Sequence, residues 1–216
     1  MINVLFATTN HGKVMRYKKY YTDTKKINFY SCNELNINLP NFEEDGKTET
    51  ENAIIKAHAF QDALIKSEVE LPKGKWVVIS LDTGLYFDKV SKLEQPGTHV
   101  KRIAGAGVFG ETPEQTFQKM STYYSSLARK YGSKLKGYFR DSYCVKDGEK
   151  EYCISANRYI TLTDTMYTKD INFPVASYFK VGEKYYHELD DNEYKDFLQP
   201  SFDALDELLA KVSVKW

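Results

Sequence analysis

Asp82 lies at the end of an apolar run, W-V-V-I-S-L at residues 76–81. The run predicts a buried strand that ends in a turn at D-T-G, residues 82–84, before a second short strand at residues 85–87. Gly84 favours that turn, because glycine adopts backbone conformations that a Cβ resists. Open α/β sheets bind ligands at the carboxyl ends of their strands, so the Asp82 carboxylate is a candidate for chemistry. On the tripeptide alone, an ordinary turn residue is the commoner interpretation.

A second candidate is the polar loop T-T-N-H-G-K at residues 8–13, between a predicted strand at 2–8 and helical rhythm at 14–21. A strand, a glycine-containing loop and a helix in this order direct backbone N–H groups and a helix N-terminus toward a phosphate. The spacing is not that of a P-loop. The alternative that Asn10 and Gly12 only form a turn therefore stays open.

A long helix is predicted after the acidic, turn-rich segment 38–46. The sequence T-E-T-E at residues 48–51 fits a capping box, with reciprocal hydrogen bonds between its first and last residues. Apolar residues then recur at helical spacing as far as residue 65. Lys56 lies near this apolar face, where a lysine either extends to solvent or projects into a cleft shared with Asp82.

The composition excludes several classes of function. Lys+Arg and Asp+Glu are equal at 30 each, so no overall charge attracts nucleic acid or an acidic membrane. The apolar run at residues 1–7 is too short for a signal peptide, and no run approaches membrane-spanning length. A cytoplasmic protein is expected. Cys32, Cys144 and Cys153 are expected to be reduced, although the last two could face each other across a hairpin.

The second half of the chain predicts an antiparallel lobe. Alternating runs at residues 138–145 and 152–162 are joined by an Asp-Gly turn, which is a strong hairpin signal. The remaining predicted elements are a strand at 27–31, a helix at 113–131 capped by Thr112, a strand at 176–181, a short helix, and a last helix at 201–212.

Four stretches, in this order, resemble motifs of the inosine triphosphate pyrophosphatase family. The family's T-G-N-x-x-K corresponds to T-T-N-H-G-K at residues 8–13, and its E-N-A-x-x-K-A to E-N-A-I-I-K-A at 51–57. Its D-D-S-G-L-x-V-D corresponds to L-D-T-G-L-Y-F-D at 81–88, and its A-P-G-x-x-S-A-R to Q-P-G-T-H-V-K-R at 95–102. The resemblance covers most of the chain and is specific over residues 5–105.

Enzymes of this family hydrolyse nucleoside triphosphates such as dITP, ITP and XTP to the monophosphate and pyrophosphate. The resemblance implies an α/β fold with a long, twisted mixed β-sheet, flanking helices and two lobes around a nucleotide cleft. Residues 1–216 would then form a single two-lobed domain. By analogy, the chain is expected to form a homodimer and to bind a nucleoside triphosphate. The balanced charge and the lack of a long apolar run predict no nucleic acid and no membrane as partners.

The resemblance also implies a set of site residues. Cleavage between the α- and β-phosphates needs a metal that neutralises the triphosphate and activates water, and Mg²⁺ is bound by a few carboxylates, phosphate oxygens and waters. Glu44 and Asp82 correspond to the Mg²⁺ ligands and, with Lys56, to the catalytic residues, whereas Glu51 serves the helix cap. The substrate-binding residues implied are Thr8, Thr9, Asn10, Lys13, Lys56, Thr83, Arg102, Phe173, Gln199 and Ser201.

The chain departs from the family pattern at three places. Leu81 replaces the first acid of the D-D pair, so the chain either does without that acid or uses Asp88, Glu43 or Asp45 in its place. The base-bracketing F-G-Y-D-P aligns with F-P-V-A-S at 173–177, and the base-reading S-H-R aligns with Q-P-S at 199–201. Histidine and arginine donate to the purine 6-oxo group, whereas Gln and Ser donate or accept. The preference for 6-oxo purines is therefore expected to change.

Three hypotheses follow. The first is a Mg²⁺-dependent nucleoside triphosphate pyrophosphatase with a changed or broadened base preference, which we favour. The second is a house-cleaning enzyme for ITP, dITP and XTP, in which His187, Arg158 or Lys195 reads the oxo group. The third is a nucleotide-binding protein that has lost catalysis. A distant resemblance to Maf-type pyrophosphatases keeps pyrimidine triphosphates among the candidate substrates.

Overall fold

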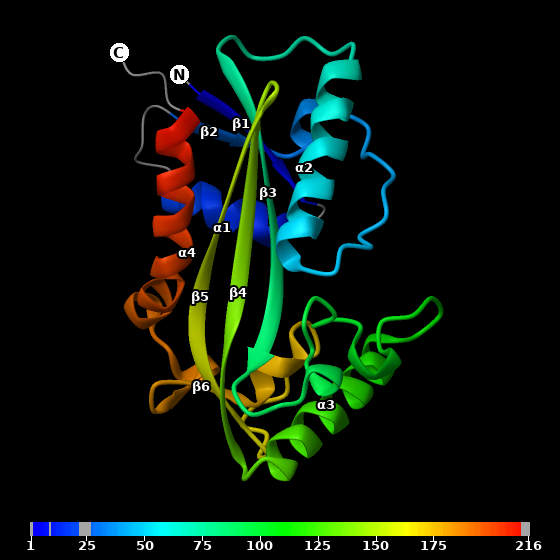
Figure 1. The fold of residues 1–216 in the computed structure, drawn as a ribbon, viewed down its shortest axis with the longest axis vertical. Coiled ribbons are helices and arrows are strands. Elements are labelled where there is room, and N and C mark those ends of the chain that lie inside the picture. The colour runs from blue at the N-terminus through cyan, green and yellow to red at the C-terminus, as the bar shows by residue number, and fades with distance from the viewer. Residues whose placement is uncertain (1, 9, 22–26, 213–216) are drawn as a thin grey trace. The chain divides into compact units, whose positions relative to one another are not determined.

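The computed structural model describes residues 2–8, 10–21 and 27–212 (Figure 1). Seven strands form one sheet in the order β2-β1-β3-β4-β5-β6-β7. The strands are β1 (Ile2–Ala7), β2 (Ile27–Tyr30), β3 (Lys75–Phe87), β4 (Lys134–Asp147), β5 (Lys150–Thr163), β6 (Phe179–Val181) and β7 (Lys184–Tyr185). The helices are α1 (His11–Tyr21), α2 (Glu49–Lys66), α3 (Pro113–Lys130) and α4 (Asp191–Val212).

The sheet is mixed. Strands β2, β1 and β3 are parallel, whereas β5, β6 and β7 are antiparallel neighbours. The chain alternates strands and helices in its first half, which favours parallel pairing, and forms a hairpin in its second half. The prediction of an α/β fold with a mixed sheet is confirmed. Within the described residues, no helix is long and apolar enough to cross a membrane.

The chain divides into two compact units. Unit 1 consists of Met1–Asp82, Ser142–Ser155 and Asp203–Trp216. Unit 2 consists of Thr83–Asp141 and Ala156–Phe202. Strands β3, β4 and β5 contribute residues to both units, so each unit is built from segments far apart in the sequence.

The core of unit 1 surrounds β1, which is buried on both faces. Side chains alternate along a strand, so Phe6 and Leu5 point to opposite faces. Phe6 packs against Tyr17 of α1, with ring centroids 4.9 Å apart. Leu5 belongs instead to an apolar cluster with Phe60 of α2 and Val78 of β3. This continuous burial explains why β1 is apolar from Val4 to Ala7, as is usual for a strand covered by helices on both faces.

The β4–β5 hairpin has a two-residue connection, Gly148 and Glu149, with Gly148 at φ +60°. The prediction of a hairpin at Asp-Gly is confirmed, and both strands extend beyond the predicted ends. A two-residue connection fixes which residues face each other across the hairpin. Ser142 therefore opposes Ser155, and their hydroxyl oxygens lie 2.7 Å apart.

Two predictions about element boundaries are wrong. Residues 82–84 do not form a turn, because β3 continues through them to Phe87 and Gly84 has no positive φ. The predicted short helix and last helix are one helix, α4, with Pro200 inside it. Proline removes only one N–H donor, and the buried apolar residues on both sides of Pro200 hold the helix together across that position.

The predicted strand at 176–181 is also shorter than expected. Residues Pro174–Ser177 form a 3-10 turn, and the strand begins only at Phe179. The core of unit 2 here is aromatic. Phe179 contacts Phe139 and Tyr186, with centroid distances of 5.5 and 5.0 Å. These large aromatic rings fill the core, although the strands in this part of the sheet are short.

Candidate active site

Two carboxylates of unit 1 converge on one lysine. The Lys56 ammonium nitrogen lies 2.7 Å from Asp82 Oδ1 and 3.3 Å from Glu44 Oε1. Asp82 and Lys56 are both buried, and the Glu44 side chain is about one-third exposed. Because both oxygens contact the same nitrogen, they can be no more than about 6 Å apart. The three residues named as catalytic from the sequence thus lie together.

Asn52 links these acids through α2. Its side-chain nitrogen donates to Asp82 Oδ2 at 3.2 Å, and its side-chain oxygen accepts the Gly46 N–H at 2.9 Å. Asn52 and Lys56 are one helical turn apart, so they lie on one face of α2 and both contact Asp82. The helix starts where predicted, because the Thr48 hydroxyl accepts the Glu51 N–H. The bond back from Glu51 differs from a capping box, since its carboxylate accepts the Lys47 N–H, one residue before the cap. One helix N-terminus therefore fixes the position of the Glu44 loop.

Gly46→Ala is expected to lower the free energy of unfolding by about 1–3 kcal/mol, the usual effect of overpacking. A Cβ at Gly46 would lie 2.6 Å from the Asn52 side-chain oxygen and 2.8 Å from the Glu51 Cβ. The loop that carries Glu44 must then move. Urea unfolding of Gly46→Ala beside Lys47→Ala, an exposed neighbour on the same loop, measures the effect. Equal stability of the two variants would contradict the view that a side chain at Gly46 overpacks against Asn52 and Glu51.

The loop predicted to bind phosphate leaves the sheet beside Asp82. Strand β1 runs parallel to β3 with Ala7 opposite Ser80, so Thr8 begins the loop next to the end of that pairing. Asn10 caps α1, because its side-chain oxygen accepts the Lys13 N–H at 3.3 Å. Helix α1 therefore begins at His11, three residues earlier than predicted. Lys13 lies half-buried in its first turn. Thr9, also predicted to contact substrate, lies outside the described residues.

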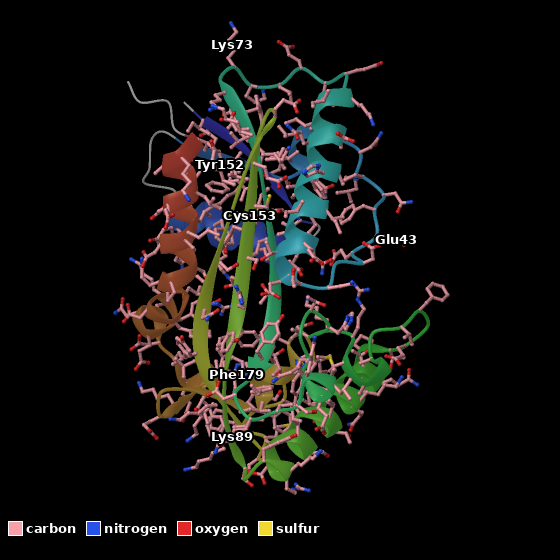
Figure 2. The ribbon with its side chains drawn as sticks, viewed as in Figure 1. Glu43, Lys73, Lys89, Tyr152, Cys153 and Phe179 are labelled. Carbon is pink, nitrogen blue, oxygen red and sulfur yellow. The ribbon has the colours of Figure 1, made fainter. Side chains whose placement is uncertain are left out.

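The acids proposed to replace Leu81 do not share the contact with Lys56. Leu81 itself is buried, and alternation along β3 directs it to the face opposite Asp82. Glu43, labelled in Figure 2, is exposed on the same loop as Glu44. Asp45 on that loop is also exposed. Asp88 is exposed in unit 2. Among the described acids of this loop, Glu44 is the one paired with Lys56.

In unit 2, a buried aspartate collects several polar side chains. Asp141 accepts hydrogen bonds from Arg158 Nε at 2.7 Å and Nη2 at 3.2 Å, from the Thr83 hydroxyl at 2.7 Å, and from the Ser201 hydroxyl at 2.5 Å. Burial raises the pKa of Asp141, but the charge and hydrogen bonds of Arg158 and the two hydroxyls outweigh it, so the pKa falls to about 2. Thr83 and Ser201, both predicted to contact substrate, here donate to Asp141.

Phe173 is packed within the aromatic core of unit 2. Its ring contacts Phe139, at a centroid distance of 5.9 Å, and Tyr186, at 6.2 Å. The aspartate that follows the phenylalanine in the family motif is absent here. Asp170, which precedes Phe173 in the sequence, accepts the Phe173 N–H at 2.8 Å. The same aspartate lies 3.4 Å from His187 Nε2. The contacts of Phe173 therefore fix its place in the core, and a contact with a base stays a prediction.

The other unit 2 residues named from the sequence lie on exposed or half-buried positions. Gln199 is half-buried in α4, and Lys195 is exposed on the same helix. Arg102 is exposed at the end of a turn. Before that turn, the chain pairs with β3 through an isolated bridge. Leu85 and Gly97 exchange two backbone hydrogen bonds there, of 2.9 and 3.0 Å. Gly97 has a positive φ of 53°, which explains the glycine at this position of the motif.

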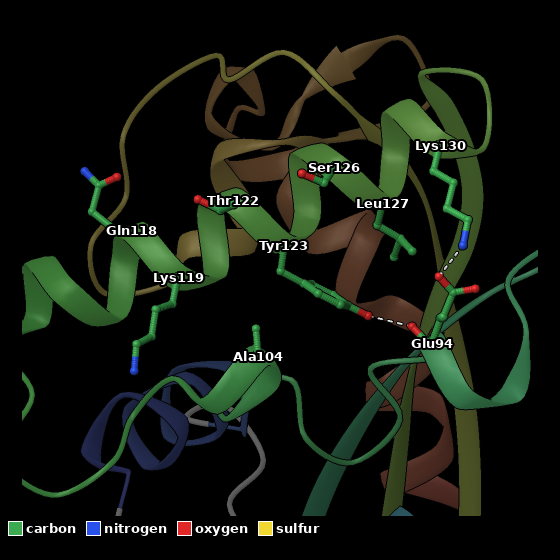
Figure 3. Close-up of a pocket in the computed structure, with 9 residues that line it drawn as sticks. All are labelled: Glu94, Ala104, Gln118, Lys119, Thr122, Tyr123, Ser126, Leu127 and Lys130. Atoms are coloured by element: carbon green, nitrogen blue, oxygen red, sulfur yellow. Dashed lines mark hydrogen bonds and ion pairs between the residues drawn. The ribbon is translucent and has the colours of Figure 1, made fainter.

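A hollow on unit 2 lies along α3 (Figure 3). The Tyr123 hydroxyl donates to the Glu94 carbonyl at 2.6 Å, and the Lys130 ammonium donates to the Glu94 carboxylate at 2.5 Å. Among the described residues that were predicted to form the site, none lines this hollow. Its lining is Glu94, Ala104, Gln118, Lys119, Thr122, Tyr123, Ser126, Leu127 and Lys130.

The fold and the acid–lysine cluster define the class of protein: an α/β protein with an open mixed sheet and a buried ion pair between Asp82 of β3 and Lys56 of α2. A model of the Ham1 family matches residues 4–211. The chain belongs to the Ham1 family, and the resemblance seen in the sequence motifs is confirmed.

Named relatives agree with this assignment, and a solved structure shares the fold. The chain is 31% identical over 151 residues to a dITP/XTP pyrophosphatase of Caldanaerobacter subterraneus, covering 70% of this chain and 66% of that protein. It is 28% identical over 146 residues to a dITP/XTP pyrophosphatase of Campylobacter jejuni, covering 64% and 67%. The matches span about two thirds of these relatives. The Ham1 protein of Staphylococcus aureus superposes with a TM-score of 0.67 at 22% identity, over 98% of this chain and all of that one.

Sequence reasoning missed two residues that organise the clusters. Asn52 was read only as part of a motif, although its amide positions both Asp82 and the Glu44 loop. Asp141 lies within the alternating pattern of the strand predicted at residues 138–145, and no neighbouring residue marks it as a functional position. Its partners Thr83, Arg158 and Ser201 come from three separate elements, so only the fold brings them together.

Proposed function

We propose that this protein hydrolyses a nucleoside triphosphate between the α- and β-phosphates, with Mg²⁺ as cofactor. The observation that carries the proposal is the contact of Lys56 with both Asp82 and Glu44. Hard divalent cations prefer carboxylate oxygens, and Mg²⁺ is usually held by one or two of them together with substrate phosphates. The donor set on the two sides of Lys56 fits that requirement.

The chain's own residues divide the remaining work. In the free protein, the positive charge of Lys56 offsets the negative charges of Asp82 and Glu44. When a bound cation offsets those charges instead, Lys56 can bind a phosphate oxygen. The N–H groups at the start of α1, with Asn10 and Lys13, provide a positive helix end for the triphosphate. Bound Mg²⁺ would neutralise the phosphate charge and lower the pKa of the attacking water. Asn52 holds the Asp82 carboxylate in one orientation.

We propose that the base preference differs from that for inosine and xanthosine. The positions of the family's His and Arg are Pro200 and Ser201, and the Ser201 hydroxyl donates to Asp141. Arg158, considered as a substitute reader of the oxo group, forms a bidentate pair with the same carboxylate. Both observations favour a changed preference over house-cleaning activity on ITP and XTP.

The other expectations remain part of the proposal. Phe173, Gln199, Ser201, Thr83 and Arg102 are proposed to contact the nucleotide, and Thr8 and Thr9 the phosphates. We further propose that the chain acts as a single two-lobed domain, as a homodimer and in the cytoplasm. These last points rest on analogy with the family.

A panel of nucleoside triphosphates with Mg²⁺, assayed for pyrophosphate and orthophosphate, tests the proposal. The expected result is pyrophosphate release that requires Mg²⁺ and is fastest with a base other than hypoxanthine or xanthine. Fastest turnover of ITP or XTP would support the house-cleaning alternative. Release of orthophosphate would mean that another bond is cut. Binding without turnover, measured by calorimetry, would favour a protein that has lost catalysis.

A further inference from the structure

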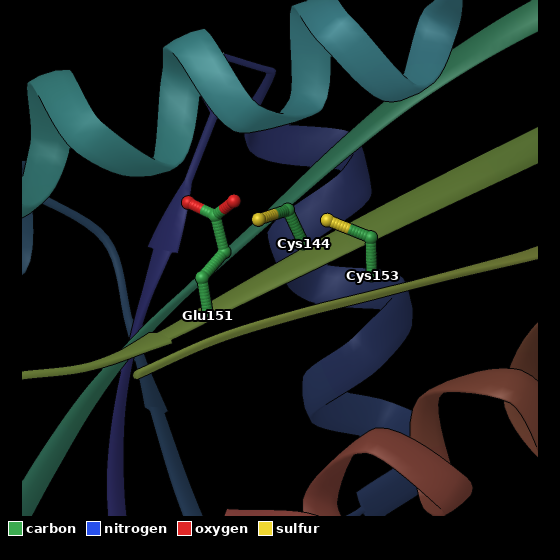
Figure 4. A group of neighbouring side chains, drawn as sticks. All are labelled: Cys144, Glu151 and Cys153. Carbon is green, nitrogen blue, oxygen red and sulfur yellow. The ribbon is translucent and has the colours of Figure 1, made fainter. Parts of the chain in front are cut away.

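A second group of metal-binding side chains lies in unit 1, on the β4–β5 hairpin (Figure 4). The sulfur atoms of Cys144 and Cys153 and a carboxylate oxygen of Glu151 all lie within 4.8 Å of one another. The hairpin register places Cys144 directly opposite Cys153. Both cysteines are free thiols.

A fourth donor comes from α2. The His58 Nε2 atom lies 2.5 Å from a Glu151 carboxylate oxygen. His58 is two residues beyond Lys56 and stands more than half exposed, so its ring has room to turn. The four side chains thus join one helix to two strands.

Helix α2 is already tied to the hairpin along its length. The Thr50 hydroxyl donates to the Ser142 hydroxyl at 3.1 Å, and the Gln61 amide donates to the Gly148 carbonyl at 2.9 Å. Between these two points, Ala53 and Ala57 pack directly on Cys144. The small alanines let the helix approach the hairpin closely, and His58 directly follows Ala57 in the chain.

We propose that Cys144, Cys153, Glu151 and His58 form a zinc site that fastens α2 to the β4–β5 hairpin. Thiolate and imidazole are the donors that Zn²⁺ prefers in four-coordinate structural sites, and carboxylate also serves. With bonds of about 2.3 Å to sulfur and about 2.0–2.1 Å to nitrogen or oxygen, tetrahedral ligand atoms lie roughly 3.3–3.8 Å apart. The two sulfur atoms and the Glu151 oxygen lie within 4.8 Å of one another, and His58 Nε2 contacts the Glu151 carboxylate.

The charges also match. Two thiolates and one carboxylate carry three negative charges, which Zn²⁺ and one further cation balance. The buried Lys146 supplies that cation, since its ammonium lies 3.9 Å from the Glu151 carboxylate. Cys144 is fully buried, whereas Glu151 and His58 reach the surface and leave a path for the ion to enter.

Cobalt binding to the full-length, reduced protein tests the proposal, because Co²⁺ replaces Zn²⁺ and reports its ligands by absorption. Excess Mg²⁺ is added to occupy oxygen-rich sites. We expect one Co²⁺ per chain, with thiolate-to-cobalt charge-transfer absorption and the visible bands of a tetrahedral site. One equivalent of Zn²⁺ should displace it and raise the thermal unfolding midpoint.

Variants assign the ligands. Cys153→Ser should weaken binding at least 100-fold and remove about half of the charge-transfer intensity, and His58→Ala, at an exposed position, should weaken binding at least 10-fold. Cys32→Ser, which removes the remaining cysteine from a separate cluster, and Asp82→Asn should leave the spectrum unchanged. Absorption without a thiolate band, or a spectrum unaffected by Cys153→Ser, would overturn the proposal. So would the absence of metal binding in a protein that instead forms a Cys144–Cys153 disulfide on oxidation.

Discussion

Asp82→Asn is expected to lower kcat for pyrophosphate release by about 10³-fold while leaving the fold intact. Removing one electrostatic contact to a transition state usually lowers kcat about 10²–10³-fold, and Asp82 is also a proposed metal ligand, which places the effect at the upper end. Asparagine keeps the size of the side chain and an oxygen that accepts from Lys56. Steady-state assays at saturating Mg²⁺, with the unfolding midpoint measured in parallel, give both quantities.

Asp62→Asn is the matched control for this variant. Asp62 lies exposed on α2, where it forms a 3.9 Å pair with Lys66. An exposed pair of this kind contributes little to stability, so this variant should keep wild-type kcat and midpoint. If Asp82→Asn retained full activity, Asp82 would not be a metal ligand. If Asp82→Asn lowered kcat and also lowered the unfolding midpoint substantially, the role of Asp82 would be structural.

The sequence predicted unit 1 well because its signals are local. The Asp82 strand, the Thr48 cap and the Lys56 position each lie in one short segment, and the parallel order of β1 and β3 brings the segments together. Even in unit 1, the prediction of a turn at residues 82–84 was wrong. The D-T-G triplet is compatible with a turn and with an extended strand, and pairing within the sheet decided between them.

Unit 2 was harder to predict for a physical reason. Its polar cluster joins residues from β3, β4, β5 and α4, and the contacts between Asp141 and its partners span as many as 60 positions. Such contacts depend on long-range pairing, which leaves no periodic pattern around any one residue. Ser201 illustrates the difficulty: its alignment with a base-reading arginine gives no sign that its hydroxyl donates to a buried carboxylate 60 positions away.

Asp141→Ala is expected to lower the free energy of unfolding by about 3–5 kcal/mol. The substitution leaves the Arg158 guanidinium buried without its carboxylate, and breaking one side of a buried pair has an effect of this size. Arg158 also lies over the Phe139 and Phe197 rings, at 5.2 and 4.9 Å, so it cannot leave without disturbing the aromatic core. Urea unfolding of the variant and the wild type measures the difference.

The double variant Asp141→Leu with Arg158→Met separates charge from packing. Removing both charges while keeping apolar volume should recover most of the lost stability, because an apolar pair is often as stable as a buried ion pair. Failure to recover it would assign the loss to packing around Asp141 and not to an unpaired arginine.

Acid unfolding offers an independent measurement of the same interaction. The pKa of Asp141 is lowered from 3.8 to about 2 in the folded protein, so the carboxylate stabilises the fold above its unfolded pKa. That contribution, about 2 kcal/mol, is lost as the pH falls from about 4 toward 2. In that window the stability of the wild type should fall more steeply than that of the double variant, which has no carboxyl group at this position. Parallel curves would show that the carboxyl group of Asp141 titrates alike in the folded and unfolded chain.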